Sequence, residues 1–384
     1  MAQVPIEEYQ SRVKRARELM AQEGMDALVV TDPLNYYYFS GHKSPAWMKS
    51  RPNIFILPLK GEASLITWSG PEMFARLYHR PFPSWVEDRI IYPEVPFTND
   101  KRVDWGIRKV LEEKNLKRGT IAIELGTETW LGIPINDFMR LKEEMPKAKF
   151  VDSGPVIWGC RMIKSEWEIS ASRKACEIGG RAWKRCIDDL RLGVSAGAIQ
   201  KMIQQYYAEE GADLDSAPVM ALGATGPEGT FQKGNILYLD GGPSYLGYKM
   251  DFTRRAAFGK PNEAQKYEHN KMWEVLFKVM DKMKPGIPVS EVFEFSQKEM
   301  SKTGLKNYSD DPAKRIGHGI GLESEPPSIN AFDATVLQEG MILTPEPKCE
   351  SVDGLVNPEE QVVITKNGPE LLSTIPHWEL YIIE

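Results

Sequence analysis

Apolar positions along the chain follow two periods, one helical and one alternating. In the first part, apolar residues three and four apart predict a helix at about residues 7–22. Strand-like apolar runs follow at residues 27–31, 36–40, 54–59 and 65–68, and a further strand at 120–125 lies between predicted helices near 101–114 and 134–143. Strands and helices mixed in this way indicate an α/β layer domain.

Turn residues near 153–155 interrupt this pattern and predict a boundary between two domains, residues 1–155 and 156–384. The second part has longer amphipathic helices, at about residues 165–191, 196–210, 262–283 and 289–303, together with hairpin strands. A chain of 384 residues exceeds the usual size of a single core, so two domains are expected. The predicted class is α/β, or α+β.

The first candidate hairpin carries two aspartates. Asp240 and Asp251 are equidistant from a midpoint at Tyr245 and Leu246, and Gly247 beside it relaxes the turn. Residues equidistant from a turn sit opposite each other on one face of an antiparallel pair. We therefore expect these two carboxylates to face each other.

The second candidate hairpin carries two glutamates. Glu346 and Glu359 are equidistant from a midpoint at Val352 and Asp353, followed by Gly354. Asp-Gly is a dipeptide favoured in tight hairpin turns. The same reasoning brings these two carboxylates together.

Four carboxylates in one pocket need a cation. Opposed carboxylates roughly 5 Å apart repel by about 3 kcal/mol at an effective dielectric near 20. A single imidazole, His318 in the sequence GHGIGL, completes the set. Oxygen ligands with one imidazole suit a pair of Mn, Co, Zn or Fe ions about 3.5–4 Å apart, bridged by a carboxylate and by a water that is the expected nucleophile. Single acidic residues on strands are more often solvated, but Asp240 and Glu346 end apolar runs, where a charge needs a partner.

The order of these residues resembles the pita-bread metalloenzymes: aminopeptidase P, prolidase, methionine aminopeptidase and the related creatinase. It is carried by the two aspartates eleven residues apart, by GHGIGL, by Glu346 in LTPEP, by Glu359 before QVVIT and by the phrase RMIKSEWEIS. Residues 160–384 resemble the pita-bread catalytic domain. Residues 1–155 resemble the smaller amino-terminal α/β domain of the creatinase and prolidase branch.

The resemblance implies a role for each residue of the set. Asp251 and Glu359 would bridge two divalent ions, Asp240 would hold one of them, and His318 and Glu346 the other. Glu346 and His318 are the predicted catalytic residues, with Glu346 passing a proton to the leaving nitrogen. Creatinase works without metals and lacks this ligand set, so the retained set favours a metal-using branch.

The chain departs from the peptidases in its histidines. The peptidases carry a second histidine a few residues after GHG and another shortly before the first aspartate strand. The corresponding segments here, GHGIGLESEPPS and ALGATGPEGTFQKGN, have none beyond His318. His42 and His377 are the candidates to replace them, although a structural or surface role for each is the simpler interpretation. A missing oxyanion donor costs hundreds-fold in rate, which puts ordinary Xaa-Pro cleavage in question.

Candidate substrate contacts come from two places. In the relatives, the loop that here carries His42, Trp47 and Arg51 reaches the active site of the other subunit of a dimer, so a homodimer is expected. An aromatic ring and a guanidinium would together suit a small zwitterion. The alternative is that Trp47 packs in a core or interface and that Arg51 is solvated. In the second domain, Tyr248 and Glu325 are the candidates.

Composition excludes several classes of function. The chain has 48 basic and 54 acidic residues, a net charge of −6, and no nucleic-acid-binding signature. The amino terminus is too charged for a signal peptide, and no run of about 18 apolar residues predicts a membrane span. A cytoplasmic enzyme with a small-molecule or short-peptide substrate is expected.

Three functions remain open at this point. The first is a dinuclear, manganese-type metal-dependent hydrolase of a small amide or Xaa-Pro peptide, such as an aminopeptidase or prolidase. The second is a non-peptidase of the same superfamily, for example a lyase similar to the dimethylsulfoniopropionate lyases, which removes an α-proton from a small zwitterion. The third is a non-catalytic binding module. We take the hydrolase as the main hypothesis, because it is the commoner chemistry of the superfamily.

Overall fold

The protein is described by a computed structural model that covers residues 4–44, 50–92, 105–373 and 378–384. The chain divides into two units, Met1–Arg161 and Met162–Glu384. Helix α6 (Gly154–Arg161) follows directly after the predicted boundary but belongs to the first unit. It packs against the first helix, where a Cβ on Gly159 would lie 2.8 Å from Leu19 Cδ1. The turn at residues 153–155 is therefore internal to the first unit.

A six-stranded mixed sheet lies at the centre of the first unit, in the order β4-β3-β2-β1-β5-β6. Strand β1 pairs antiparallel with β2 and parallel with β5, and all its residues are buried. Burial on both faces explains why β1 is an unbroken apolar run. The strands are β1 (Ala27–Val30), β2 (Ile54–Pro58), β3 (Ser64–Thr67), β4 (Asp88–Ile91), β5 (Thr120–Ile123) and β6 (Lys149–Asp152).

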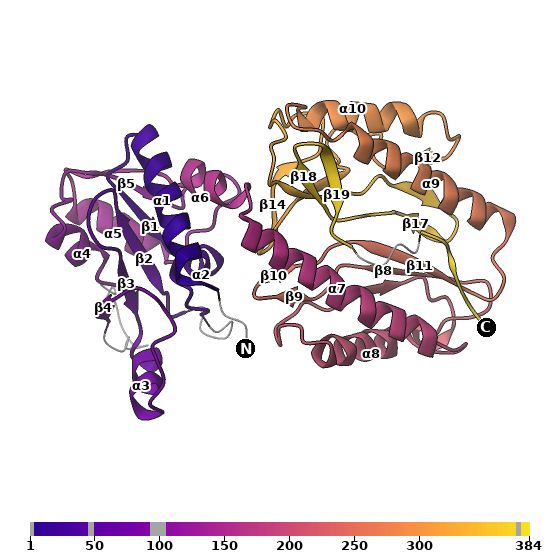
Figure 1. The fold of residues 1–384 in the computed structure, drawn as a ribbon, viewed down its shortest axis with the longest axis horizontal. Coiled ribbons are helices and arrows are strands. Elements are labelled where there is room, and N and C mark those ends of the chain that lie inside the picture. Colours follow the sequence, from indigo (N-terminus) through magenta and orange to yellow (C-terminus); the bar gives the residue numbers. More distant parts are fainter. Residues whose placement is uncertain (1–3, 45–49, 93–104, 374–377) are drawn as a thin grey trace. The chain divides into compact units, whose positions relative to one another are not determined.

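Helices cover both faces of this sheet (Figure 1). One group is α1, α2 and α6; the other is α4 and α5, whose apolar residues share a core with β1, β2 and β5. The α/β class predicted for this part is confirmed. The helices are α1 (Ile6–Gln22), α2 (Pro33–Ser40), α3 (Ser69–Leu77), α4 (Ile107–Glu113), α5 (Ile135–Glu144) and α6.

The strand predicted at residues 36–40 is wrong, because these residues belong to α2. Asp32 caps this helix by accepting hydrogen bonds from the backbone N–H groups of Leu34 and Asn35, at 2.9 and 2.8 Å. Pro33 occupies the first helical position, where its missing N–H costs nothing. An aspartate cap followed by proline outweighs the strand preference of the tyrosines.

The second unit contains two principal sheets, in the orders β20-β11-β8-β7 and β14-β13-β15-β18-β19, with two small ones, β12-β16-β17 and β10-β9. Its early strands are β7 (Met220–Leu222), β8 (Ile236–Asp240), β9 (Ser244–Tyr245), β10 (Tyr248–Lys249) and β11 (Thr253–Phe258). The later ones are β12 (Lys306–Asn307), β13 (Gly317–Ile320), β14 (Ser324–Ser328), β15 (Ile342–Pro345), β16 (Cys349–Ser351), β17 (Gly354–Val356), β18 (Val362–Thr365), β19 (Gly368–Leu371) and β20 (Tyr381–Ile383).

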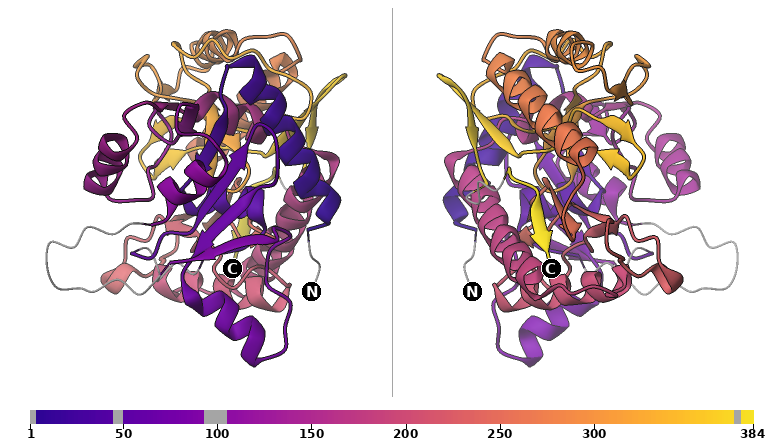
Figure 2. Two further views of the ribbon diagram at one scale, coloured as in Figure 1. Left: turned by 90° about the vertical axis from the view of Figure 1, so that its left-hand side faces the viewer. Right: turned by 90° about the vertical axis from the view of Figure 1, so that its right-hand side faces the viewer.

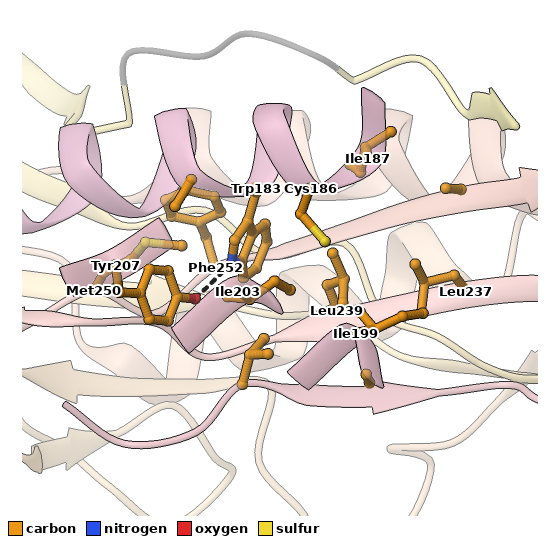
Figure 3. Packing of buried hydrophobic residues seen from close by; sticks show 14 of the residues in the cluster. Trp183, Cys186, Ile187, Ile199, Ile203, Tyr207, Leu237, Leu239, Met250 and Phe252 are labelled. Atoms are coloured by element: carbon orange, nitrogen blue, oxygen red, sulfur yellow. Dashed lines mark hydrogen bonds between the residues drawn. The ribbon is translucent and has the colours of Figure 1, made fainter. Parts of the chain in front are cut away.

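Two helix pairs enclose these strands, α7 and α8 on one side and α9 and α10 on the other (Figures 1 and 2). Under α7 and α8, Trp183 donates a hydrogen bond to the Tyr207 hydroxyl at 2.6 Å and packs edge-on against Phe252 (Figure 3). Capping boxes at Ser165 and Asn262 start α7 and α9. The helical segments are α7 (Glu166–Asp189), α8 (Ala196–Glu209), the short η2 (Pro227–Gly229), α9 (Glu263–Lys282) and α10 (Val289–Met300).

No helix in the described residues is both long and apolar enough to cross a membrane.

Candidate metal centre

The hairpin that carries the two aspartates turns one residue later than predicted. Leu246 and Gly247 both have positive φ, as a two-residue hairpin turn requires, and both backbone N–H groups donate to the Asp213 carboxylate. Asp240 therefore pairs with Thr253 and not with Asp251. The predicted pairing of the two aspartates is wrong in register, because the contact with Asp213 selects the turn.

Asp251 still faces the site, because its neighbours in sequence face the other way. Met250 and Phe252 are buried in the core beneath α7 and α8 (Figure 3). Successive side chains of an extended chain point to opposite sides, so Asp251 points away from that core. Its backbone N–H donates to the Gln361 side chain at 2.9 Å, and Gln361 in turn donates to the Lys249 carbonyl at 3.2 Å.

The hairpin that carries the two glutamates has the predicted register. Cys349 pairs with Val356, and further along the same two chain segments Leu343 pairs with Val362, so both pairings share the centre that relates Glu346 to Glu359. This prediction is confirmed. The Thr253 N–H donates to the Glu359 carbonyl at 3.3 Å, which joins this hairpin to the aspartate hairpin.

His318 lies on β13, between β14 and β15, with glycines on both sides. A Cβ on Gly317 would lie 2.5 Å from the Thr344 carbonyl oxygen, and one on Gly319 would lie 2.3 Å from that of Pro326. Only glycine allows such close backbone approach. His318 Nδ1 lies 2.9 Å from the Gly319 carbonyl oxygen and so donates to it, which leaves Nε2 as a lone-pair donor, 3.5 Å from Asp251 Oδ2.

Three of the five predicted ligands converge closely. Asp251, His318 and Glu359 each offer a ligand atom, and these atoms all lie within 4.8 Å of one another. Glu359 Oε2 is buried and has no hydrogen-bond partner among the described residues. A buried carboxylate oxygen without a hydrogen-bond partner, next to an imidazole and a second carboxylate, is the environment expected of a divalent-cation site.

The remaining two carboxylates lie close enough to act electrostatically on this cluster. Burial, then the charges of Asp240 and Glu346, raise the pKa of Asp251 to about 7. Burial raises the pKa of Glu359 well above its usual range, and the same neighbours and Asp251 add to the effect. Burial lowers the pKa of His318, so its neutral form is favoured. Mutual repulsion of buried carboxylates favours a bound cation.

The site includes four residues that sequence reasoning missed. Tyr238 donates to Asp240 Oδ2 at 2.8 Å, and Lys348 Nζ lies 2.7 Å from Glu346 Oε2. Asn357 donates to the Tyr238 hydroxyl at 2.9 Å and to Glu346 Oε2 at 3.3 Å. The fourth is Gln361. Each lies two positions from a predicted ligand, the spacing that puts side chains on one side of an extended chain, so this signal was available.

Of the predicted substrate contacts in the first unit, His42 and Arg51 lie in the described residues. Trp47 and His377 lie outside the described residues. His42 is buried, its Nδ1 is 2.9 Å from the Tyr36 hydroxyl, and burial lowers its pKa to about 4. Arg51 is half-buried. The substrate roles of His42 and Arg51 remain predictions.

The two candidates of the second unit are both buried and have polar partners. Tyr248 donates to Glu168 Oε1 at 2.6 Å and packs edge-on against Trp167. Glu325 accepts the N–H of Leu322 at 3.1 Å and pairs with Lys164 at 2.9 Å. Glu325 is opposite Gly319, directly after His318 on the neighbouring strand. Through these contacts Glu325 supports the turn between β13 and β14, and the substrate roles of Tyr248 and Glu325 remain predictions.

Residues 170–366 of the chain match metallopeptidase family M24, and residues 12–163 match the Creatinase/Prolidase N-terminal domain. With the fold and the carboxylate–imidazole site, these matches define a metal-dependent hydrolase of the pita-bread metallopeptidase superfamily. The chain belongs to metallopeptidase family M24. The resemblance and the fold class predicted from the sequence are thereby confirmed.

Similar proteins include the Xaa-Pro dipeptidases of Pyrococcus horikoshii and Pyrococcus furiosus. They are 28% and 27% identical over 372 residues, which cover 94% of this chain and 96% and 97% of theirs. The solved prolidase of Pyrococcus horikoshii has a TM-score of 0.74 and 25% identity, covering 95% of this chain and 98% of its own. A Xaa-Pro dipeptidase from Bacillus anthracis has a TM-score of 0.79 and 23% identity, over 98% and 100%. The latter shows the fold alone.

Proposed function

We propose that this protein is a metal-dependent dipeptidase that cleaves Xaa-Pro-type peptides. The observation that carries the proposal is the buried cluster of Asp251, His318 and Glu359, with Glu359 Oε2 left without a partner. Two relatives that match almost the whole chain are Xaa-Pro dipeptidases. The expected homodimer and cytoplasmic location remain predictions.

The three clustered residues would hold a divalent ion, with Asp240 and Glu346 beside it. Such an ion supplies a Lewis acid that polarises a carbonyl and acidifies water. Glu346 accepts the proton of the attacking water and delivers it to the leaving nitrogen. Asn357 and Lys348 hold the Glu346 carboxylate in place at Oε2. The sequence predicts two ions, and the three converging ligand atoms of Asp251, His318 and Glu359 by themselves suit one ion.

The segment directly after His318, GHGIGLESEPPS, carries no second imidazole, so another group must stabilise the oxyanion. The described histidine elsewhere in this unit, His269, hydrogen-bonds the Trp378 carbonyl from α9. Arg315 and Lys348, by contrast, act on the site, because the charges of both lower the pKa of His318 in addition to burial. We assign oxyanion stabilisation to Lys348, whose Nζ lies 2.7 Å from Glu346 Oε2, since a preorganised positive charge can replace a hydrogen-bond donor.

The test is product analysis of the enzyme loaded in turn with Mn²⁺, Co²⁺, Zn²⁺ or Fe²⁺. Ala-Pro and Leu-Pro should release free amino acids, whereas Pro-Ala should not, and a chelator should stop the reaction. Glu346→Gln should lower kcat by about 10²–10⁴-fold. Asp188→Asn on the exposed face of α7 is the matched control and should not change kcat. Intact Xaa-Pro peptides with all four metals would overturn the proposal.

The absent imidazole favours one second candidate, a lyase that acts on a small zwitterion such as dimethylsulfoniopropionate. Adding this compound to the same reaction separates the two. Acrylate without peptide cleavage would assign the site to the lyase.

A further inference from the structure

A cavity of about 530 Å³ opens at the surface of the first unit, beside α3 (Figure 1). Its lining comes from residues 42–43, which follow α2, from Trp68 and part of α3 with Tyr78, and from the segment 80–83. Pockets that hold small molecules measure about 300–1,000 Å³. The cavity contains no residue of the metal centre, because all of its lining belongs to the first unit.

Aromatic rings form one wall of the cavity. Phe74 and Tyr78 lie one helical turn apart, their ring centroids are 6.2 Å apart, and they are 50% and 66% exposed. Trp68, directly before α3, lies against Gly70, where a Cβ would fall 1.8 Å from the indole ring. Glycine is therefore required for Trp68 to pack there. Exposed rings that gather around one cavity favour a binding site over an ordinary surface.

Prolines and hydrogen bonds restrict a second wall. Pro81 and Pro83 line the cavity, and their rings fix the backbone φ angle. The segment that carries them is tied at both ends: the Arg80 N–H donates to the Ala75 carbonyl at 2.9 Å, and the Ser84 hydroxyl donates to the carbonyl at the end of α2 at 2.6 Å. This wall is preformed, so a ligand loses little affinity to the ordering of the chain.

His42 adds a polar group to the lining. Burial lowers its pKa to about 4, so the imidazole is neutral at neutral pH. We assign the Tyr36 hydroxyl as the donor to His42 Nδ1, 2.9 Å away, because a phenol is more acidic than a neutral imidazole. The imidazole hydrogen is then on Nε2. His42 is thereby a neutral hydrogen-bond donor.

The charge of the lining is positive. Lys43 and Arg80 both line the cavity and are exposed, and no aspartate or glutamate is among the described residues that line it. Positive charge without a facing carboxylate favours an anionic ligand and opposes an ammonium group. A guanidinium can bind a carboxylate through two parallel hydrogen bonds, and aromatic rings pack favourably against another ring.

We propose that this cavity binds an aromatic carboxylate, with its ring against Phe74 and Tyr78 and its carboxylate held by Arg80 and Lys43. A free aromatic acid and the carboxyl-terminal residue of a peptide offer the same two groups. Binding needs no metal ion, so the site is independent of the proposed function.

The test is titration calorimetry of the whole protein, freed of metal by a chelator, with phenylacetate as the probe. Without a metal, the carboxylate cluster of the second unit repels an anion, so binding there is excluded. Phenylacetate should bind one to one. Benzylamine, which has the same ring and the opposite charge, and acetate, which lacks the ring, should each bind at least about tenfold more weakly.

A second arm separates the two sources of the ligand. N-acetyl-glycyl-phenylalanine ends in the same ring and carboxylate. Tighter binding of this peptide than of phenylacetate would support a peptide terminus as the occupant, and weaker binding would support a free acid.

Two variants and their matched controls locate the site. Arg80→Met should weaken phenylacetate binding about tenfold or more, because a charge-assisted hydrogen bond is lost. Phe74→Ala should weaken it about fivefold through the loss of ring packing. Arg76→Met and Leu77→Ala are the controls, because both residues are exposed on α3 and neither lines the cavity. Their affinity should not change.

No binding of phenylacetate or of the peptide by the wild type at about 1 mM would overturn the inference. Equal binding of benzylamine would do the same, and so would unchanged affinity in folded Arg80→Met and Phe74→Ala proteins. Sedimentation velocity adds one further outcome. A wild-type dimer that dissociates in Phe74→Ala would show that a second copy of the chain covers the cavity, which would also overturn the inference.

Discussion

The Gln361 side chain accepts a hydrogen bond from the backbone N–H of Asp251 at 2.9 Å, and this bond joins the two acidic hairpins. Gln361 is fully buried, and it also donates to the Lys249 carbonyl at 3.2 Å. One side chain thus holds the chain on both sides of Met250, and with it the orientation of the Asp251 carboxylate.

Gln361→Met should therefore weaken metal binding without removing a ligand. Loss of such an outer support typically costs about 10–100-fold in metal affinity, and leaving the Asp251 N–H unpaired costs about 1–3 kcal/mol of stability. Titration calorimetry with Mn²⁺ and chemical denaturation measure the two effects. Gln205→Met, on the exposed side of α8, is the control. Unchanged affinity in Gln361→Met would mean that Asp251 is positioned without this bond.

Asp251→Ala should abolish both metal binding and activity while the fold persists. The backbone N–H of Asp251 donates to Gln361, and its carboxylate is repelled by those of Asp240 and Glu346. In the metal-free protein the change to alanine therefore removes charge repulsion and costs little packing. Circular dichroism, metal content and peptide cleavage measure the three outcomes. Asp188→Ala, at an exposed position paired with Lys184, controls for loss of an aspartate. A metal-replete, active Asp251→Ala protein would remove the site assignment.

The metal-free protein should lose stability as the pH rises from about 4 to about 7. The pKa of Asp251 is 3.8 in its ordinary state and about 7 in the fold, because of burial and the charges of Asp240 and Glu346. The folded state therefore holds its proton more tightly than the unfolded state. The resulting stabilisation is complete below pH 4 and is lost as the pH passes about 7.

Thermal melting of chelated protein between pH 5 and 8 measures this slope, which should flatten in Asp251→Asn. The metal-loaded protein should behave in the opposite way, because protons compete with the ion for the carboxylates and metal affinity rises with pH. A chelated wild type whose melting temperature increases over this range would contradict the assigned protonation.

Removing one partner of the Lys164–Glu325 ion pair should destabilise the protein. Both side chains are almost completely buried, with 2% and 1% exposure. Glu325→Leu should cost about 3–5 kcal/mol, because it leaves a buried ammonium without a partner. The double change Lys164→Met with Glu325→Leu should recover most of this loss, since replacing both partners by apolar groups removes the uncompensated charge. Denaturant unfolding measures the free energy of unfolding of the wild type, of Glu325→Leu and of the double variant. A double variant as unstable as Glu325→Leu would show that the ion pair itself supplies the stability.

The register of one of the two acidic hairpins could be predicted from the local sequence alone. The glutamate hairpin has the register predicted from its sequence: Ser351 pairs with Gly354, so Val352 and Asp353 form the turn and Gly354 begins β17. For the aspartate hairpin, the same argument from equal distances to the turn placed the turn one residue too early. There the glycines permit several turns, and Asp213, which is distant in sequence, selects Leu246 and Gly247.

The sequence by itself determined the family, the helices of the second unit and the identity of the acidic and imidazole residues, because these depend on residue type and short-range spacing. Only the tertiary structure decided that residues 36–40 are helical, that three of the five predicted ligands converge, and that Lys348 lies against Glu346. Convergence and burial arise from contacts between segments up to about a hundred residues apart, and those contacts also set the protonation of Asp251. No local pattern contains that information.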